Sequence, residues 1–195
     1  MTSIALFVTS ADPPTAGHQQ ILNWLSYQFD RVLVWASDNP FKQHQTPIEH
    51  RASMLQLLID DIEPHRANIH CDQALSHPKT LFTVQRSQQR YPEASFTLVV
   101  GSDLLEQLPT WYRVDELLSQ VKLLVVPRPG YPVHPTALAR LRQMEAQVEV
   151  ADLTGLPVSS SAYRNEGDLT VITPPVKAYI HREHLYTCQD VPNLT

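Results

Sequence analysis

The chain has 195 residues, of which 43% are hydrophobic and 18% are charged, and its formal net charge at pH 7 is −5. A chain of this size suits one domain with a single hydrophobic core, and its composition excludes collagen-like, low-complexity and disordered classes. Its 5 glycines against 16 prolines predict stiff loops, and the lack of a basic run argues against a nucleic-acid partner.

Six short apolar runs, rich in β-branched residues, alternate with segments long enough for crossover helices. Continuous apolar runs are typical of strands that are covered on both faces. The pattern predicts an α/β fold: a Rossmann-like open parallel sheet with helices on both faces and a C-terminal helical segment, in one domain over 1–195. The predicted strands are Ile4–Val8, Val32–Trp35, a weaker Ala67–Cys71, Phe96–Val100, Val121–Val126 and Val148–Ala151.

Apolar residues at helical spacing predict helices between and after these strands. The four predicted helices contain Ile21, Leu22 and Leu25; Met54, Leu55, Leu58 and Ile59; Leu138, Leu141 and Met144; and the span Val176–Leu185.

The two cysteines, Cys71 and Cys188, lie far apart and have no C-x-x-C neighbour, so the sequence indicates neither a disulfide framework nor a zinc site. The N-terminus lacks a charged leader region, and no stretch of 18 apolar residues occurs. We therefore expect a cytoplasmic protein with reduced thiols and no membrane partner. A homo-oligomer is compatible with the sequence.

Ligands of open parallel sheets bind beyond the carboxyl ends of the strands. The first strand is followed by a polar turn with Ser10, Asp12 and Thr15, and then by Gly17 and His18 at the start of a helix. Unpaired N–H groups and the helix dipole make such a turn an anion site. A helix cap at Asp12 or Thr15, with a surface histidine, explains the same spacing equally well.

The loops after the second and fourth strands carry further polar residues. Lys42 is the one cation of its loop, where a solvated charge is the common case. Gly101 permits close backbone approach, Asp103 can accept hydrogen bonds from ribose hydroxyls, and the Trp111 indole can stack on a flat heteroaromatic ring. A helix cap at Ser102 or Asp103 with a core tryptophan is the competing interpretation.

The last two strand ends carry an arginine each. Arg128 stands between two prolines and suits carboxylate or phosphate recognition, although a turn with a surface arginine looks the same. Ser159 and Ser160 open a helix that also carries Arg164, which suits an anion, although a serine-rich helix cap is commoner. Together these clusters predict a nucleotide site that has neither a Walker A loop nor a G-x-G-x-x-G motif.

Two of the segments resemble motifs of the nucleotidyltransferase superfamily. Its (H/T)-x-G-H motif is similar to Asp12-Pro-Pro-Thr15-Ala-Gly17-His18, and its I-S-S-T-x-I-R motif to Val158-Ser-Ser-Ser-Ala-Tyr-Arg164. Within the superfamily the chain most resembles the bacterial nicotinate-nucleotide adenylyltransferase family, nearly from end to end. The further matching segments are Asn39-Pro-Phe-Lys42, His50-Arg51 with Met54, Thr80 with Thr83, Gly101-Ser-Asp103 with Leu108-Pro-Thr-Trp111, and Tyr179-Ile180 with Leu185-Tyr186.

The resemblance implies one nucleotidyltransferase domain that transfers the adenylyl group of ATP to nicotinate mononucleotide, giving deamido-NAD and pyrophosphate in NAD biosynthesis. It implies Mg²⁺ bound with ATP rather than to dedicated protein ligands. The implied catalytic residues are His18, Thr15, Lys42 and Arg164. The implied ATP-binding residues are Ser10, Thr15, His18, Gly101, Asp103, Ser159, Ser160 and Arg164, and the implied mononucleotide-binding residues are Asp12, Lys42, Thr80, Thr83, Trp111 and Arg128.

The chain departs from the family pattern in the first turn, where Val8 and Thr9 stand in place of glycines, and at Phe41 and Leu81-Phe82. These departures leave two alternatives: an enzyme that uses nicotinamide mononucleotide as acceptor, or a non-catalytic nucleotide-binding protein with a degenerate phosphate loop.

Overall fold

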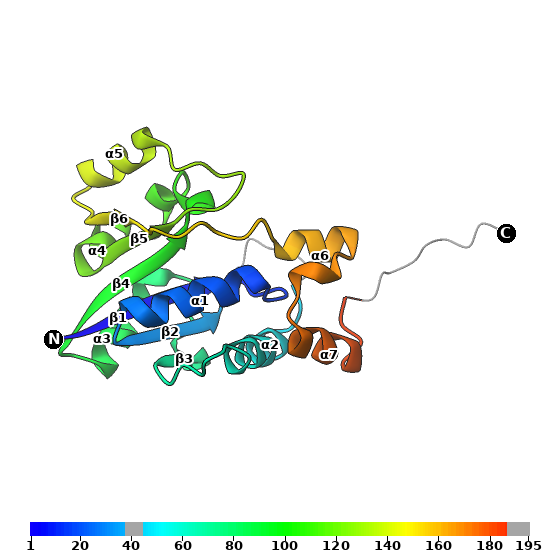
Figure 1. Cartoon of the computed structure of the whole chain (residues 1–195). Coiled ribbons are helices and arrows are strands. Elements are labelled where there is room, and N and C mark those ends of the chain that lie inside the picture. Colours follow the sequence, from blue (N-terminus) through cyan, green and yellow to red (C-terminus); the bar gives the residue numbers. More distant parts are fainter. Residues whose placement is uncertain (38–44, 187–195) are drawn as a thin grey trace.

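Six parallel strands form the central sheet of the computed structural model, which describes residues 1–37 and 45–186. The strands are β1 (Thr2–Thr9), β2 (Arg31–Ala36), β3 (Ile69–Cys71), β4 (Ala94–Gly101), β5 (Lys122–Val126) and β6 (Val148–Val150). The helices are α1 (Ala16–Gln28), α2 (Ile48–Asp60), α3 (Thr80–Arg90), α4 (Val114–Gln120), α5 (Pro135–Gln143), α6 (Ser160–Glu166) and α7 (Pro174–Arg182). The predicted parallel α/β sheet and its six strands are confirmed (Figure 1).

The strand order β3-β2-β1-β4-β5-β6 places β1 beside both β2 and β4. Phe7 of β1 is in register with Val34 on one side and Val99 on the other. From β1 the chain therefore adds β2 and β3 on one side of the sheet, and then crosses back to add β4, β5 and β6 on the other side. In such a sheet, ligands bind at the crevice where the winding reverses, which here lies beyond the carboxyl ends of β1 and β4.

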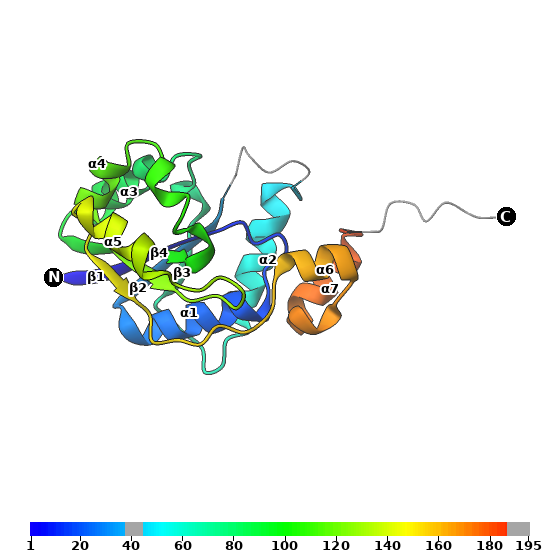
Figure 2. The same ribbon diagram turned by 90° about the horizontal axis from the view of Figure 1, so that it is seen from above.

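Two hydrophobic cores cover the two faces of the sheet. Alternation along β1 sends Ile4 and Leu6 to the core under α3, α4 and α5, whereas Ala5 and Phe7 face the core under α1, α2 and α7. Figure 2 shows α1 and the group α3 to α5 on opposite sides of the strands. Burial on both faces explains why the strands have continuously apolar sequences.

The helices differ from the sequence prediction in three places. The helix predicted from Leu138, Leu141 and Met144 is α5, but it buries Ala137 and Leu141 and ends before Met144. The C-terminal helix ends at Arg182 rather than at residue 185. The apolar pattern did not single out α3 or α4, because the buried face of α3 includes Thr83 and Ser87 and α4 has only seven residues.

The segment 151–159 runs along α1 and delivers α6 to the start of that helix (Figures 1 and 2). The Gln20 side chain holds it in place, because its Nε2 donates to the Thr154 carbonyl at 3.1 Å and its Oε1 accepts from the Leu156 N–H at 3.0 Å. A Cβ on Gly17 would lie 2.9 Å from Cγ2 of Val158, so glycine at this position permits the close approach. No helix in the described part of the chain has the length and apolarity to cross a membrane.

We predict that Leu58→Ala lowers the free energy of unfolding by about 3 kcal/mol, because Leu58 is fully buried between α2 and the sheet and its truncation leaves a cavity. The matched change Leu169→Ala should cost less than about 1 kcal/mol, since Leu169 is 48% exposed. Urea unfolding followed by circular dichroism measures both. Equal losses of unfolding free energy in the two variants would contradict the burial of Leu58 in the core.

Candidate functional site

The predicted site residues lie after the carboxyl ends of the strands, in three groups. The turn group comprises the β1–α1 turn (residues 10–15) with His18, Ser159, Ser160 and Arg164. The ion-pair group comprises Gly101, Asp103 and Arg128, and the third group comprises Thr80, Thr83 and Trp111 around the start of α3. Lys42, the remaining predicted residue, lies outside the described residues.

His18 is oriented by the residue that begins its own helix. The backbone N–H of Thr15, the N-cap of α1, donates to Nδ1 of His18 at 3.0 Å, and the Thr15 hydroxyl lies 2.9 Å from the same nitrogen. A backbone N–H can only donate, so Nδ1 must accept, and the neutral ring then carries its proton on Nε2. The ring packs against Phe7, with centroids 6.4 Å apart. His18 is thereby held as a hydrogen-bond donor at the start of α1.

The β1–α1 turn is tied to α6, which comes from the other end of the chain. The Arg164 guanidinium donates to the carbonyl of Asp12, and the Ser160 hydroxyl donates to the carbonyl of Pro13 at 2.8 Å. The Arg164 charge therefore lies directly against the turn. This confirms that the two segments with family-like motifs meet in space.

Tyr186 closes the turn from the C-terminal side. Its hydroxyl donates to Oδ1 of Asp12 at 2.6 Å, and its ring meets the ring of Tyr163 edge to face, with centroids 5.7 Å apart. Burial, followed by the hydrogen bond to Asp12, raises the pKa of Tyr186 well above its ordinary value. The tyrosine therefore stays a protonated donor to the buried carboxylate, which is 5% exposed.

Ser159 caps α6, which is the structural role that the sequence left open. Its hydroxyl accepts from the N–H of Ala162 at 3.1 Å, and Arg164 donates to the Ser161 hydroxyl at 3.2 Å. Ser160 is likewise engaged with the turn. Phosphate binding by Ser159 and Ser160 stays a prediction.

The two residues that replace family glycines are used to pack the turn. Val8 packs partly buried against the core under α3 to α5, and the Thr9 hydroxyl accepts from the N–H of Ala11 at 3.2 Å. Ala11 takes the left-handed conformation, with φ of 48°, which turns the chain toward Asp12.

Arg51 of α2 joins three loops beneath the turn, and the sequence analysis assigned it no role. It is 1% exposed, and its guanidinium donates to the carbonyls of Ser10 at 2.8 Å, Ser37 at 2.7 Å and Thr46 at 2.7 Å. Among the described residues it forms no ion pair with a carboxylate. A sequence signal existed, because Arg51 shares one helix face with Met54, Leu55 and Leu58.

Asp103 and Arg128 form an ion pair of 2.8 Å between the ends of β4 and β5. The sequence prediction assigned them to different substrates, and the structure brings them into contact. A Cβ on Gly101 would lie 2.3 Å from Oδ1 of Asp103 and 2.9 Å from Cδ of Arg128, so a side chain at this position would displace the pair. The Ser102 hydroxyl accepts from the Arg128 N–H at 2.9 Å and donates to the Tyr131 carbonyl at 2.6 Å, which fixes the loop.

The third group lies where α3 approaches the loop after the 3₁₀ helix Leu108–Thr110. Trp111 is half-buried against the core, so it is in part the core tryptophan of the competing interpretation. Thr83 is 1% exposed, and its hydroxyl has no hydrogen-bond partner among the described residues. Thr80 is half-buried at the first position of α3.

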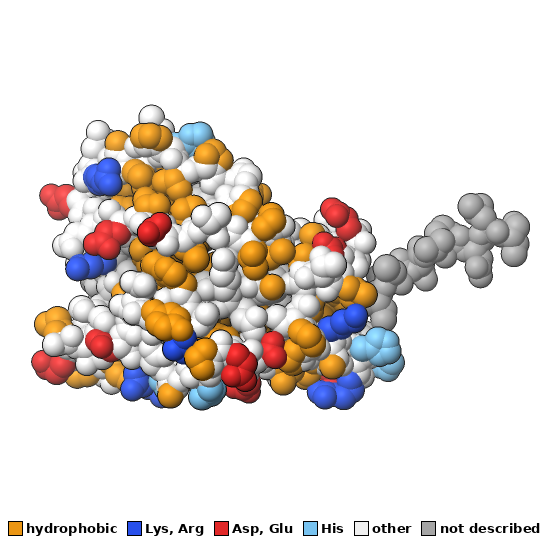
Figure 3. All heavy atoms as spheres, in the orientation of Figure 1, with side chains coloured by type: hydrophobic (Ala, Val, Ile, Leu, Met, Phe, Trp, Pro, Cys, Tyr) orange, Lys and Arg blue, Asp and Glu red, His pale blue; other side chains and the backbone are white. Residues whose placement is uncertain are grey.

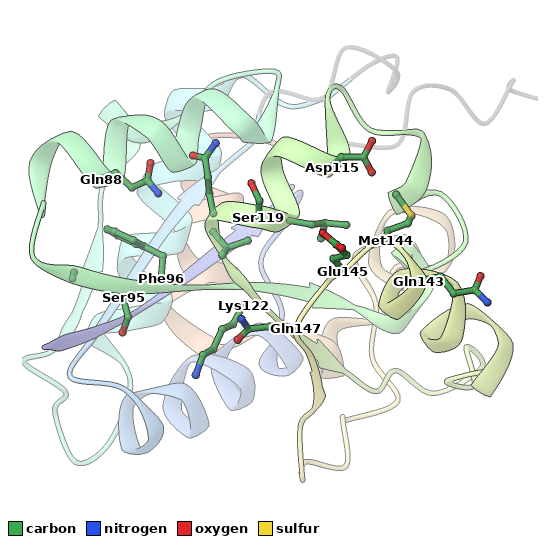
Figure 4. A pocket seen from close by; sticks show the side chains of 14 residues that line it. Gln88, Ser95, Phe96, Asp115, Ser119, Lys122, Gln143, Met144, Glu145 and Gln147 are labelled. Carbon is green, nitrogen blue, oxygen red and sulfur yellow. The ribbon is translucent and has the colours of Figure 1, made fainter.

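Cavities occur at both ends of the sheet. One of about 230 Å³ adjoins the ion-pair group and is lined by Asp103, Tyr131 and His134. Another of about 600 Å³ lies at the opposite edge, where Lys122 begins β5, Phe96 is the third residue of β4 and Met144 follows α5 (Figure 4). The larger cavity faces the amino ends of the strands, far from the predicted site residues, so the carboxyl edge remains the candidate site.

Within residues 1–37 and 45–186, no three His, Cys, Asp or Glu side chains gather as a metal cluster. Charged side chains of both signs are scattered over the face shown in Figure 3, without a concentrated basic patch on that face.

Comparisons with known proteins show the family of the chain. A family model described as Cytidylyltransferase-like matches residues 6–166. The chain is 42% identical to a "Probable nicotinate-nucleotide adenylyltransferase" of Synechocystis sp., covering 94% of this chain and 98% of that protein. It is 30% identical to the nicotinate-nucleotide adenylyltransferase of Bacillus subtilis, covering 95% and 99%. Its fold matches the Plasmodium falciparum nicotinic acid mononucleotide adenylyltransferase complexed with NaAD, with a TM-score of 0.82, 19% identity, and coverage of 95% and 98%.

We predict that Arg51→Met lowers the free energy of unfolding by about 3 kcal/mol, because the carbonyls of Ser10, Ser37 and Thr46 lose their hydrogen-bond donor. Arg140→Met, which removes the same charge from an exposed position on α5, should change it by less than about 0.5 kcal/mol. Urea unfolding compares the two variants. A neutral effect of Arg51→Met would show that water replaces the guanidinium.

Proposed function

Because the chain belongs to the nicotinate-nucleotide adenylyltransferase family of cytidylyltransferase-like proteins, we propose that it transfers the adenylyl group of ATP to nicotinate mononucleotide, yielding deamido-NAD and pyrophosphate. The observation that carries the proposal is the junction of α6 with the β1–α1 turn. It collects the start of α1, the His18 ring and the Arg164 guanidinium at the crevice of the sheet, a combination suited to a polyphosphate.

The proposed reaction needs no protein nucleophile. A phosphate oxygen of the mononucleotide attacks the α-phosphorus of ATP, the bond from that phosphorus to the bridging oxygen breaks, and pyrophosphate leaves. The protein's task is to align the two phosphates and to stabilise the charge that develops between them. His18 would donate from Nε2, while Arg164 and the first N–H groups of α1 would supply positive charge at the triphosphate.

Magnesium would enter as part of the ATP substrate. It prefers oxygen ligands and commonly keeps several waters, so the phosphates themselves can hold it with few protein ligands. We place the reaction in the cytoplasm, where ATP and Mg²⁺ are available.

The other two groups would serve the nucleosides. Asp103 would accept from ribose hydroxyls while its ion pair with Arg128 holds the carboxylate in place, and Trp111 would offer its indole to the pyridine ring. Thr80 and Thr83 would complete the mononucleotide pocket, with Lys42 at the reacting phosphates. Nicotinamide mononucleotide remains the alternative acceptor.

The alternative of a non-catalytic nucleotide-binding protein rested on Val8 and Thr9. Both side chains are engaged in packing the turn, Val8 with the core and Thr9 with Ala11, and the turn still meets α6. We therefore favour the enzyme.

We predict that His18→Ala lowers kcat by at least about a hundredfold, because the variant loses a donor aligned with the developing phosphate charge. Pyrophosphate release is measured with ATP, Mg²⁺ and nicotinate mononucleotide. His65→Ala, which removes an exposed histidine from the α2–β3 loop, should leave kcat unchanged.

The melting temperature of His18→Ala separates a catalytic effect from loss of the α1 cap. Wild-type protein that releases no pyrophosphate with either the acid or the amide mononucleotide would overturn the proposed function.

A further inference from the structure

A lysine lies on an exposed aromatic surface at the start of α3. Nζ of Lys79 is 3.9 Å from the ring centroid of Tyr112, whose side chain is 45% exposed. The Tyr112 ring lies 5.8 Å from that of Phe82, which lies 4.8 Å from that of His77. We call His77, Phe82 and Tyr112 the aromatic wall. It joins the approach to α3 to the loop that carries Trp111.

The backbone of Lys79 is held in place on this wall. Its N–H donates to Nδ1 of His77 at 3.0 Å, and its carbonyl accepts from the N–H of Phe82 at 3.1 Å. The cation–π contact with Tyr112 then orients an otherwise flexible side chain. The ammonium is thus a positioned charge, although the residue itself is exposed.

The Lys79 charge is not neutralised by its described surroundings. Within residues 1–37 and 45–186 it forms no ion pair with a carboxylate, and the first turn of α3 contains no acidic residue. The positive end of the α3 dipole therefore adds to the ammonium. This corner of the site is suited to a negatively charged group on the ligand.

The place of Lys79 in the chain associates it with the pyridine ring of the mononucleotide rather than with the reacting phosphates. It follows β3, and Tyr112 directly follows Trp111, the residue to which the proposed function assigns the pyridine ring. The two candidate acceptors differ only in the substituent of that ring, which is a carboxylate in the acid and a neutral carboxamide in the amide. A positioned ammonium beside a ring bound at Trp111 would distinguish these substituents by charge.

We propose that Lys79 is a specificity-determining residue, which selects the acid mononucleotide by pairing with the carboxylate of its ring. The inference rests on the proposed function, because it takes the pyridine ring to lie at Trp111. Lys79 holds no reacting atom, so its loss affects the choice between acceptors more than the chemical step.

Calorimetric titration with nicotinate and nicotinamide mononucleotides tests this role without requiring turnover. In Lys79→Met the ratio of acid to amide affinity should fall about fivefold, which corresponds to about 1 kcal/mol, the upper end of the range for an exposed ion pair. The amide affinity should stay within about twofold of wild type, and Lys79→Arg should retain the preference. Lys122→Met is the matched control, because it removes the same charge at the opposite edge of the sheet (Figure 4).

Two results with the variants would overturn the role of Lys79: a ratio of acid to amide affinity that is unchanged in Lys79→Met, or one that falls equally in Lys122→Met. Wild-type protein without a preference for the acid would overturn it as well. The proposed function is tested separately by pyrophosphate release from wild-type protein, so an active wild type with an unaltered Lys79→Met ratio refutes only this inference. Higher salt should weaken the acid preference of wild type but not that of Lys79→Met.

Discussion

The guanidinium of Arg51 connects the loops on which the candidate site is built. It reaches the carbonyls of Ser10, Ser37 and Thr46, which follow β1, follow β2 and precede α2. A buried charge is costly unless it is well hydrogen-bonded, and here carbonyl dipoles take the place of a carboxylate. The positive charge is thus accommodated without being cancelled by a described neighbour, so it also favours anions at the adjoining turn.

The turn above Arg51 is completed by residues that are remote in sequence. Arg164 and Tyr186 both bind Asp12, across 152 and 174 residues of chain. The same contacts that dock α6 and Tyr186 therefore shape the β1–α1 turn. An anion bound at the turn would stabilise this docking, and the docking would stabilise the bound anion, because both depend on the same conformation of residues 10–15.

Several polar residues combine a structural with a chemical task. Thr15 begins α1 and sets the tautomer of His18, and Ser102 locks the loop that carries Arg128. Lys79 is the N-cap of α3 and carries the charge proposed to pair with the acceptor. Because each of these side chains is positioned by backbone that it also helps to fix, they are held in place before a ligand arrives, which lowers the entropy lost on binding.

The pattern of apolar and polar residues along the chain is enough to predict the sheet and the loops that carry the candidate site. Continuous apolar runs such as Phe96–Val100 reveal doubly covered strands, and the polar residues that follow them must share one edge when the strands are parallel. The interaction partners become visible only in the folded chain: Asp103 with Arg128, Asp12 with Tyr186, Arg51 with three carbonyls, and Lys79 with Tyr112. Periodicity is a local property that the chain displays along its length. Hydrogen bonds and ion pairs between distant residues depend on how the elements pack, which no single segment encodes.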